Sequence, residues 1–292
     1  MAIYNLGSIN ADNFYSVPRI PVAGETLAAS RLTRGLGGKG TNMSVAAARA
    51  AARVFHIGAV GQDGRWAQTR LLEYGVDVTH IAVSDLPTGH ANICVAPDGE
   101  NQIVLFAGAN HSITKDQIGT ALSGADMGDF LVLQNETNGQ THAAEMGVRL
   151  GLRVAYAAAP FDTAAVQAVL PFIEFLFLNA VEAEQLETAL GVAPDQLPVR
   201  HVIVTLGADG CRWIDTVKGK TRHFPAFQVT PVDTTGAGDT FTGYVIAGVD
   251  RGQPVAQAIE TASVAAALMV TREGTADVIP DLKDVQEAKS AI

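Results

Sequence analysis

Residues 232–244 read VDTTGAGDTFTGY, and within them GAGD, at residues 236–239, places two glycines, a small residue and one carboxylate between a predicted strand and a predicted helix. Glycine lets a backbone approach a ligand closely, and a helix that starts at Ala237 or Gly238 points its free N–H groups at the loop. The pattern therefore favours an anion site beside which Asp239 could act as a base. An acidic residue that only complements the helix dipole is the alternative.

A second glycine-rich stretch, GLGGKGTN at residues 35–42, precedes an alanine-rich helical pattern. Its bare backbone could approach a polyhydroxylated ligand closely, with Lys39 and Asn42 as polar contacts. A plain turn in which Asn42 caps the helix is the alternative. The spacing matches neither the Walker A loop nor the dinucleotide-binding fingerprint.

Polar side chains also follow the first predicted strand, in GSINADNF at residues 7–14. Asn10 and Asp12 are two residues apart, so in an extended chain they face the same side. Open α/β sheets bind ligands at the carboxyl ends of their strands. This pair could therefore grip adjacent hydroxyls of a sugar, unless it only begins a turn.

Two shorter stretches complete the set of candidates. NAVE, from Asn179 to Glu182, has the spacing of a helix capping box. TLGADG, at residues 205–210, is a strand end followed by a glycine turn, which could wrap a nucleotide or simply form a hairpin.

The elements that must position these residues alternate between strands and helices. Strands are predicted at 3–9, 54–61, 130–135, 153–158, 175–179 and 201–207, and helices at 42–51, about 65–74, 138–150, 181–190, about 237–249 and about 254–271. Such alternation predicts a mostly parallel sheet with helices on both faces and right-handed crossovers. The last two helices are expected to close the chain.

Two stretches, at about 13–34 and 80–107, carry short β-type runs without helices. The second contains a hairpin pattern that turns at PDGEN, residues 97–101. We expect both to form one small sheet inserted in a single domain of residues 1–292. Its apolar face would cover a ligand, a second subunit or both.

Composition restricts the class of protein. The 292 residues are 48% hydrophobic and 17% charged, which is typical of a globular protein. The net charge of −10 argues against a nucleic-acid or anionic-membrane partner. Two cysteines, Cys94 and Cys211, make no disulfide framework or metal motif. The first ten residues lack a signal-peptide pattern, and the most apolar segment is too short to span a bilayer, so we expect a cytoplasmic protein.

In combination and order, these motifs resemble the ribokinase-like (PfkB) carbohydrate kinases, from about Asn5 to Pro280. GGKGTN is similar to the family's N-terminal signature and DTTGAGDTF to its C-terminal signature. NAVE resembles the N-x-x-E motif, and VTLGADG the nucleotide-binding segment. Within the family, the stretches SINAD, PVAGET and GGKG are most similar to the ribokinase branch.

The resemblance implies a three-layer α/β/α fold with a small β-sheet lid, and a homodimer joined through the lid sheets. It implies transfer of the γ-phosphoryl group of ATP to a primary hydroxyl of a small sugar, most simply D-ribose at O5, with Mg²⁺ and K⁺. A fructose, fructose-phosphate or nucleoside kinase of the same fold, or a sugar- or nucleotide-binding protein without turnover, stays open.

The resemblance also assigns roles to residues. The catalytic base would be Asp239, with an anion hole formed by Gly236, Ala237 and Gly238. The sugar would be held, together with Asp239, by Asn10, Asp12, Gly38, Lys39, Asn42 and Glu136. The nucleotide and its magnesium would be served by Asn179, Glu182, Thr205, Gly207, Gly210, Gly238 and Ser263, with Glu182 acting on magnesium indirectly. A monovalent cation would be held by Asp233 and Thr235 and by carbonyls near Arg272 and Gly274.

The chain departs from the family pattern at four places. AAAP at residues 157–160 replaces the usual NPAP, so an amide is missing at Ala157. Ser263 takes the place of the usual histidine or asparagine beside the adenine. The segment 191–200 is short, so we expect one face of the sheet to be thinly covered near the nucleotide side. Residues 13–15, NFY, are bulky and could reshape the sugar pocket.

Overall fold

The computed structural model describes residues 1–290. Its large sheet contains nine strands in the order β13-β12-β11-β10-β9-β8-β1-β4-β5. The parallel strands are β1 (Ala2–Leu6), β4 (Arg53–Gly61), β5 (Ile81–Ser84), β8 (Phe130–Gln134), β9 (Arg153–Ala157), β10 (Phe175–Asn179) and β11 (His201–Thr205). At one edge, β12 (Cys211–Asp215) and β13 (Lys220–Phe224) pair antiparallel. The mostly parallel sheet predicted from the apolar runs is therefore confirmed.

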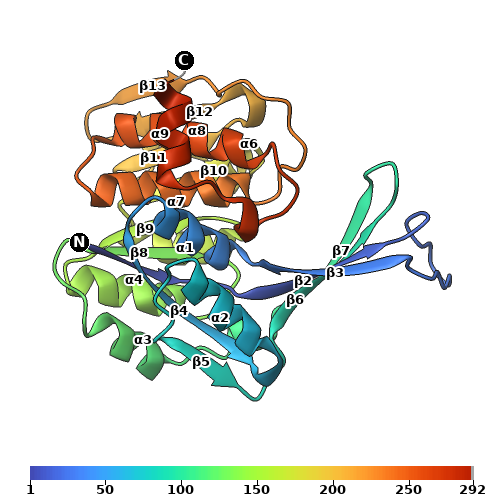
Figure 1. Ribbon diagram of the computed structural model, residues 1–292. Coiled ribbons are helices and arrows are strands. Elements are labelled where there is room, and N and C mark those ends of the chain that lie inside the picture. Colours follow the sequence, from blue (N-terminus) through green and yellow to red (C-terminus); the bar gives the residue numbers. More distant parts are fainter. Residues whose placement is uncertain (291–292) are drawn as a thin grey trace.

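Helices cover both faces of this sheet, because successive strand side chains point to opposite faces. Ile3 belongs to one core cluster and Tyr4 to the other. The Ile3 cluster contains residues of α1 (Lys39–Arg49), α2 (Arg65–Glu73), α7 (Ala237–Asp250), α8 (Val255–Met269) and α9 (Leu282–Ser290). The Tyr4 cluster contains residues of α3 (Lys115–Leu122), α4 (Gln140–Arg149), α5 (Thr163–Val169) and α6 (Ala180–Leu190). The result is a three-layer α/β/α arrangement (Figure 1).

A separate four-stranded sheet, which we call the lid, projects from the side of the main body (Figure 1). Its order is β3-β2-β6-β7. Its strands are β2 (Asn10–Ser16), β3 (Arg31–Gly37), β6 (Gly89–Val95) and β7 (Asn101–Phe106). The two sequence insertions therefore do meet in one small sheet, and β6 and β7 form the predicted hairpin.

Three predicted boundaries were wrong. The lid does not include residues 81–84, because that apolar run returns from α2 and extends the large sheet beside β4. The first strand ends at Leu6 rather than at residue 9, since Gly7 crosses Gly40 at close range. A Cβ on Gly7 would lie 2.5 Å from the Gly40 Cα. Finally, a third helix, α9, follows the two that were expected to close the chain.

Sequence reasoning also missed α3 and α5, which are short and capped by Thr114 and Asp162. The segment 191–200 is little more than one 3₁₀ turn, Pro194–Gln196. It leaves an open groove of about 710 Å³ beside Arg153 and Glu174. Arg153 begins β9, and Glu174 directly precedes β10, so the groove lies at the amino ends of these strands. The thinly covered part of the sheet is therefore at the end opposite the nucleotide side, not near it. Among residues 1–290, no helix is long and apolar enough to cross a membrane.

Candidate active site

The predicted catalytic and nucleotide residues meet around one cavity of about 640 Å³ at the carboxyl ends of β10 and β11. Of the predicted residues, those that line it are Lys39, Asn179, Glu182, Thr205, Gly207, Gly210, Gly236, Ala237, Gly238, Asp239 and Ser263. Of the remaining sugar residues, Asn42 bonds Asp239 and Glu136 bonds the amide of Lys39, so both contact residues that line the cavity. This edge of the sheet is where open α/β folds bind ligands.

The start of α7 forms the floor of the anion site. Gly236 precedes the helix in the left-handed region, with φ 79°, and a Cβ there would lie 3.2 Å from the Asn42 Nδ2. The amide of Thr240 bonds the Gly236 carbonyl at 2.9 Å, which begins the helical pattern. Among the described residues, no acceptor bonds the amides of Gly238 and Asp239. These amides are therefore free to bind an anion.

Asp239 is buried in the first turn of α7 and contacts α1. Asn42 Nδ2 donates a hydrogen bond of 2.9 Å to Asp239 Oδ2. Burial raises the pKa of Asp239 to about 6, against the opposing effects of Lys39 and of the Asn42 bond. A carboxyl group with this pKa is ionised at neutral pH, yet it takes up a proton more readily than an exposed one.

Lys39 supplies the positive charge of the site. Asp239 raises the pKa of Lys39, and burial opposes this rise only in part. The Lys39 amide donates to Glu136 Oε2 at 3.0 Å, and Ser8 Oγ donates to the same oxygen at 2.5 Å. The first turn of α1 is thus tied to the end of β8 and to the loop after β1.

The predicted sugar residues Asn10 and Asp12 belong to lid strand β2, not to the end of the first strand. Asp12 lies over Gly37, where a Cβ would stand 1.9 Å from the Asp12 Oδ2. Burial raises the pKa of Asp12 to about 7, and the nearby charge of Glu136 adds to the effect. Asn10 Oδ1 accepts a bond of 2.8 Å from Asn110 Nδ2.

Sequence reasoning missed two of these contacts, from Ser8 and Asn110. Asn110 also fixes the strand start, since its Oδ1 accepts from the Ile9 amide at 2.9 Å. It follows the lid hairpin by only a few residues and has no motif around it, so nothing in the sequence marked it.

Gly38, the predicted neighbour of Lys39, caps α1 at φ 97°, and a Cβ there would lie 2.9 Å from the Ser8 carbonyl oxygen.

A buried polar network supports the start of α1. Asn5 Nδ2 donates to the Gly40 carbonyl at 2.7 Å and to Ser44 Oγ at 2.8 Å, while Gln134 Nε2 donates to Asn5 Oδ1 at 2.7 Å. The His56 ring bonds Ser44 Oγ at 2.8 Å and the Gly7 carbonyl at 3.0 Å. Burial lowers the pKa of His56 to about 4, so the ring is neutral. The network holds the Gly7–Gly40 crossing, on which the placement of Lys39 and Asn42 depends.

The nucleotide side is built by two turns. The capping box of α6 is formed: Glu182 accepts from the Asn179 amide and Asn179 accepts from the Glu182 amide, both at 2.8 Å. Glu182 nevertheless lines the cavity, and burial raises its pKa. The TLGADG stretch is the tight connection between antiparallel β11 and β12, and Gly207 and Gly210 also line the cavity. The hairpin interpretation is therefore confirmed, and the contact of this stretch with a nucleotide stays a prediction.

The four predicted cation residues do not line the cavity. Asp233 accepts from the amide of Thr235 at 2.9 Å and from the amide of Gly274 at 3.2 Å. Arg272 follows α8, and its amide bonds the Met269 carbonyl at 3.0 Å. The structure thus brings Asp233, Thr235 and Gly274 together as one tied loop, with Arg272 in the turn beside it. Whether a cation binds there stays a prediction.

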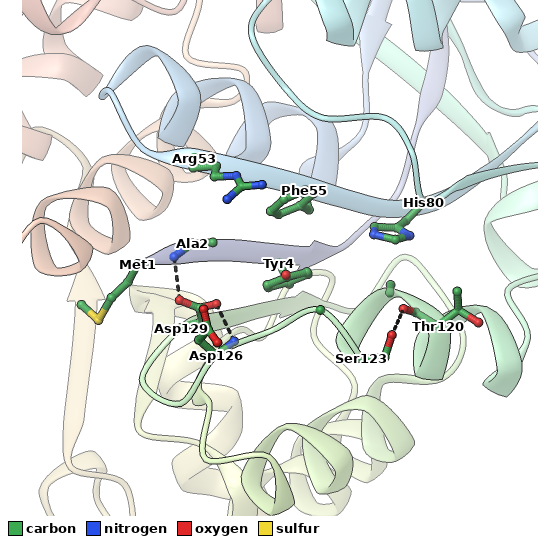
Figure 2. Close-up of a pocket in the computed structure, with 12 residues that line it drawn as sticks. Met1, Ala2, Tyr4, Arg53, Phe55, His80, Thr120, Ser123, Asp126 and Asp129 are labelled. Carbon is green, nitrogen blue, oxygen red and sulfur yellow. Dashed lines mark hydrogen bonds between the residues drawn. The ribbon is translucent and has the colours of Figure 1, made fainter.

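A second cavity, of about 490 Å³, opens at the opposite edge of the sheet (Figure 2). Tyr4 and Phe55 stack there with ring centroids 4.9 Å apart, and Arg53 lies over the Phe55 ring. None of the predicted site residues lines it. The candidate catalytic and nucleotide-binding residues therefore gather at the carboxyl ends of the strands.

A buried carboxylate beside free helix amides, at the carboxyl edge of a three-layer α/β/α sheet, defines the class as a phosphotransferase of this fold. The family model of the pfkB family carbohydrate kinases matches residues 3–282. The chain belongs to this family, whose members transfer a phosphoryl group to a sugar.

Individual relatives align over almost the whole chain. The ribokinase of Haemophilus influenzae is 36% identical over 97% of this chain and 96% of its own length. The crystal structure of Cryptococcus neoformans ribokinase in complex with ADP is 32% identical, with a TM-score of 0.84 over 98% of this chain and 99% of that one. The structure of Arabidopsis thaliana ribokinase complexed with ribose and ATP is 27% identical, with a TM-score of 0.87 over 98% of each chain.

Proposed function

We propose that this kinase transfers the γ-phosphoryl group of ATP to a primary hydroxyl of a pentose, most simply O5 of D-ribose. The observation that carries the proposal is the position of Asp239, buried within the first turn of α7 beside free amides and bonded to Asn42. The similarity to ribokinases, among them one solved with ribose and ATP, supports ribose as the acceptor and ATP as the donor.

The chemistry follows from this geometry. The sugar hydroxyl attacks the γ-phosphorus in line while the bond to the ADP oxygen breaks, through a loose transition state. Asp239 accepts the hydroxyl proton, which becomes acidic as the new bond forms. The amides of Gly238 and Asp239, with Lys39, stabilise the charge on the transferred group. Catalysis is therefore mostly positioning and electrostatic stabilisation.

The sugar would lie between α1 and lid strand β2. Asp12 and Glu136 offer carboxylate oxygens to its hydroxyls, and Asn10 and Gly38 border the same space. Among residues 1–290, no donor bonds the buried Asn42 Oδ1, so this atom suits an incoming hydroxyl. Closure of the lid over the sugar would exclude water, which otherwise competes as the acceptor.

The residues present fit the two cations that the family implies. Bound Mg²⁺ would neutralise phosphate charge, and Glu182 is the cavity carboxylate able to orient its water ligands. Within the described residues, no cluster of three metal-ligating side chains exists, which suits an ion carried mainly by phosphates and water. A K⁺ ion beside Asp233 would hold the anion loop in place; carboxylate and carbonyl oxygens suit such a hard cation.

We also propose that the whole chain works as one kinase domain with its lid, and that two copies join through their lid sheets. Strand β7 at the lid edge carries four consecutive exposed apolar residues, Ile103–Phe106, at 48–62% exposure. An apolar strand edge of this kind needs cover. Light scattering should therefore give twice 30.5 kDa; a single-chain mass at micromolar concentration would remove the dimer.

We place this activity in the cytoplasm, where ATP is available and where unpaired thiols such as Cys94 and Cys211 stay reduced. The proposed function is tested by ADP release in the presence of Mg²⁺ and K⁺ across a panel of D-ribose, 2-deoxyribose, fructose, fructose phosphates and nucleosides. Fastest turnover with ribose is expected. Turnover only with another acceptor would reassign the substrate, and sugar binding without ADP release would remove the kinase role altogether.

A further inference from the structure

The active-site cavity extends away from the anion loop along α8. Helices α7 and α8 run antiparallel: Thr240 contacts Met269, and a Cβ on Gly248 would touch Ala258. The end of α8 therefore lies at the anion loop. Ser263 is six residues before Met269, so it stands about 9 Å further along the helix axis. With phosphates at the anion loop, the base of the nucleotide lies at the Ser263 end.

The walls at that end are mostly apolar. Ala266 and Ala267 line the cavity from α8, and Phe227 and Val229 line it from the segment after β13. From α8 and residues 226–231, the polar side chains that line the cavity are those of Ser263 and Gln228, and each donates one hydrogen bond to a backbone carbonyl. Ser263 Oγ donates to the Ile259 carbonyl at 3.0 Å, and the exposed Gln228 amide donates to the Ala226 carbonyl at 3.3 Å.

An apolar pocket discriminates poorly between ligands of similar shape, by about 10- to 200-fold. A site with buried hydrogen-bonding groups that match one ligand discriminates by about 10⁴- to 10⁵-fold. The base end of this cavity is an apolar pocket, whereas its phosphate end carries the charged and hydrogen-bonding groups. Binding energy should therefore come from the triphosphate and from apolar contact with the base.

We infer that this kinase has a broad phosphoryl-donor range and uses GTP as well as ATP. The use of GTP in turnover rests on the proposed kinase function. The selectivity of the pocket between adenine and guanine nucleotides can be measured by binding alone. The expected ratio of ATP to GTP efficiency, as kcat/KM at saturating sugar, is about tenfold, and the ratio of affinities for the non-hydrolysable analogues AMP-PNP and GMP-PNP is similar.

The experiment measures both ratios on the full chain with Mg²⁺ present. Ratios below 100 support the inference, and either ratio above 100 in favour of adenine overturns it. Analogue binding with a small ratio, but no phosphorylation of any sugar, would support the low selectivity of the pocket for the base, and would overturn the use of GTP as a donor together with the proposed function. Binding of neither analogue would overturn the inference.

Two variants test whether a side chain reads the base. In Ser263→Ala and Gln228→Ala, the ratio of ATP to GTP efficiency should stay within threefold of the parent, because both side chains are bonded to backbone. A tenfold change in either variant would show that the side chain recognises the base and would overturn the inference. Ser123→Ala is the matched control, since Ser123 Oγ also donates to a backbone carbonyl, that of Thr120 at 2.7 Å, outside this cavity.

Discussion

Replacing Asp239 by asparagine would separate the chemistry of the carboxylate from its cost to folding. The amide keeps the shape of the side chain and one oxygen for the bond from Asn42, so folding and sugar binding should persist. The amide cannot take the proton of the sugar hydroxyl. Loss of general-base catalysis costs about 10²- to 10⁴-fold, so kcat should fall by that factor with little change in the sugar KM.

The same substitution should stabilise the protein. Burial raises the pKa of Asp239 from 3.8 to about 6, so the folded state disfavours the charged form. At 1.36 kcal/mol per pKa unit, the ionised carboxylate costs about 3 kcal/mol at pH 7, and the cost disappears below about pH 4, where both states are protonated. Asparagine removes it, which predicts a rise in Tm of about 4–6 °C at pH 7 and a smaller rise at pH 5.

Asp250→Asn is the matched control for this prediction. Asp250 is also buried and stands at the other end of the same helix, and burial raises its pKa. Its amide variant should gain stability and keep the parent kcat. Coupled measurement of ADP release and of thermal unfolding decides the matter. A kcat for Asp239→Asn within tenfold of the parent would refute the role of the carboxylate as base.

Three further predictions concern the sugar side and its support. Gly37→Ala should raise the sugar KM at least about tenfold, because its Cβ would lie 1.9 Å from Asp12 Oδ2. The control Gly35→Ala, whose Cβ would meet its first neighbour at 3.7 Å, should leave the KM unchanged. Equal KM values in the two variants would contradict the placement of Asp12. Burial raises the pKa of Asp12 to about 7, so its protonation should lower kcat/KM for the sugar below pH 7. Asp12→Asn should move this acid limb to about pH 6, where Asp239 is protonated; an unmoved limb would assign it to another group. Ser44→Ala should cost about 1–3 kcal/mol in urea unfolding, because His56 loses its hydroxyl partner; a loss below about 0.5 kcal/mol would show that the network does not stabilise the fold.

The sequence alone determined the features that depend on local patterns. Alternating apolar runs predicted the parallel sheet and its two helical layers, because strand and helix periodicities are properties of neighbouring residues. The NAVE spacing predicted the capping box from Asn179 to Glu182, which needs only one helical turn. The glycines before Asp239 predicted a helix start with a close-approach loop, since positive φ at Gly236 is a local requirement.

Tertiary structure decided what depends on residues far apart in the chain. It placed Asn110 against Asn10 and Ser8 against Glu136, and it assigned residues 81–84 to the large sheet instead of the lid. It also set the pKa of Asp239, because the desolvation of a carboxyl group depends on everything packed around it. A sequence can name an acidic residue beside a helix start, but only the packing of α1 against α7 buries it and gives it the proton affinity of a base.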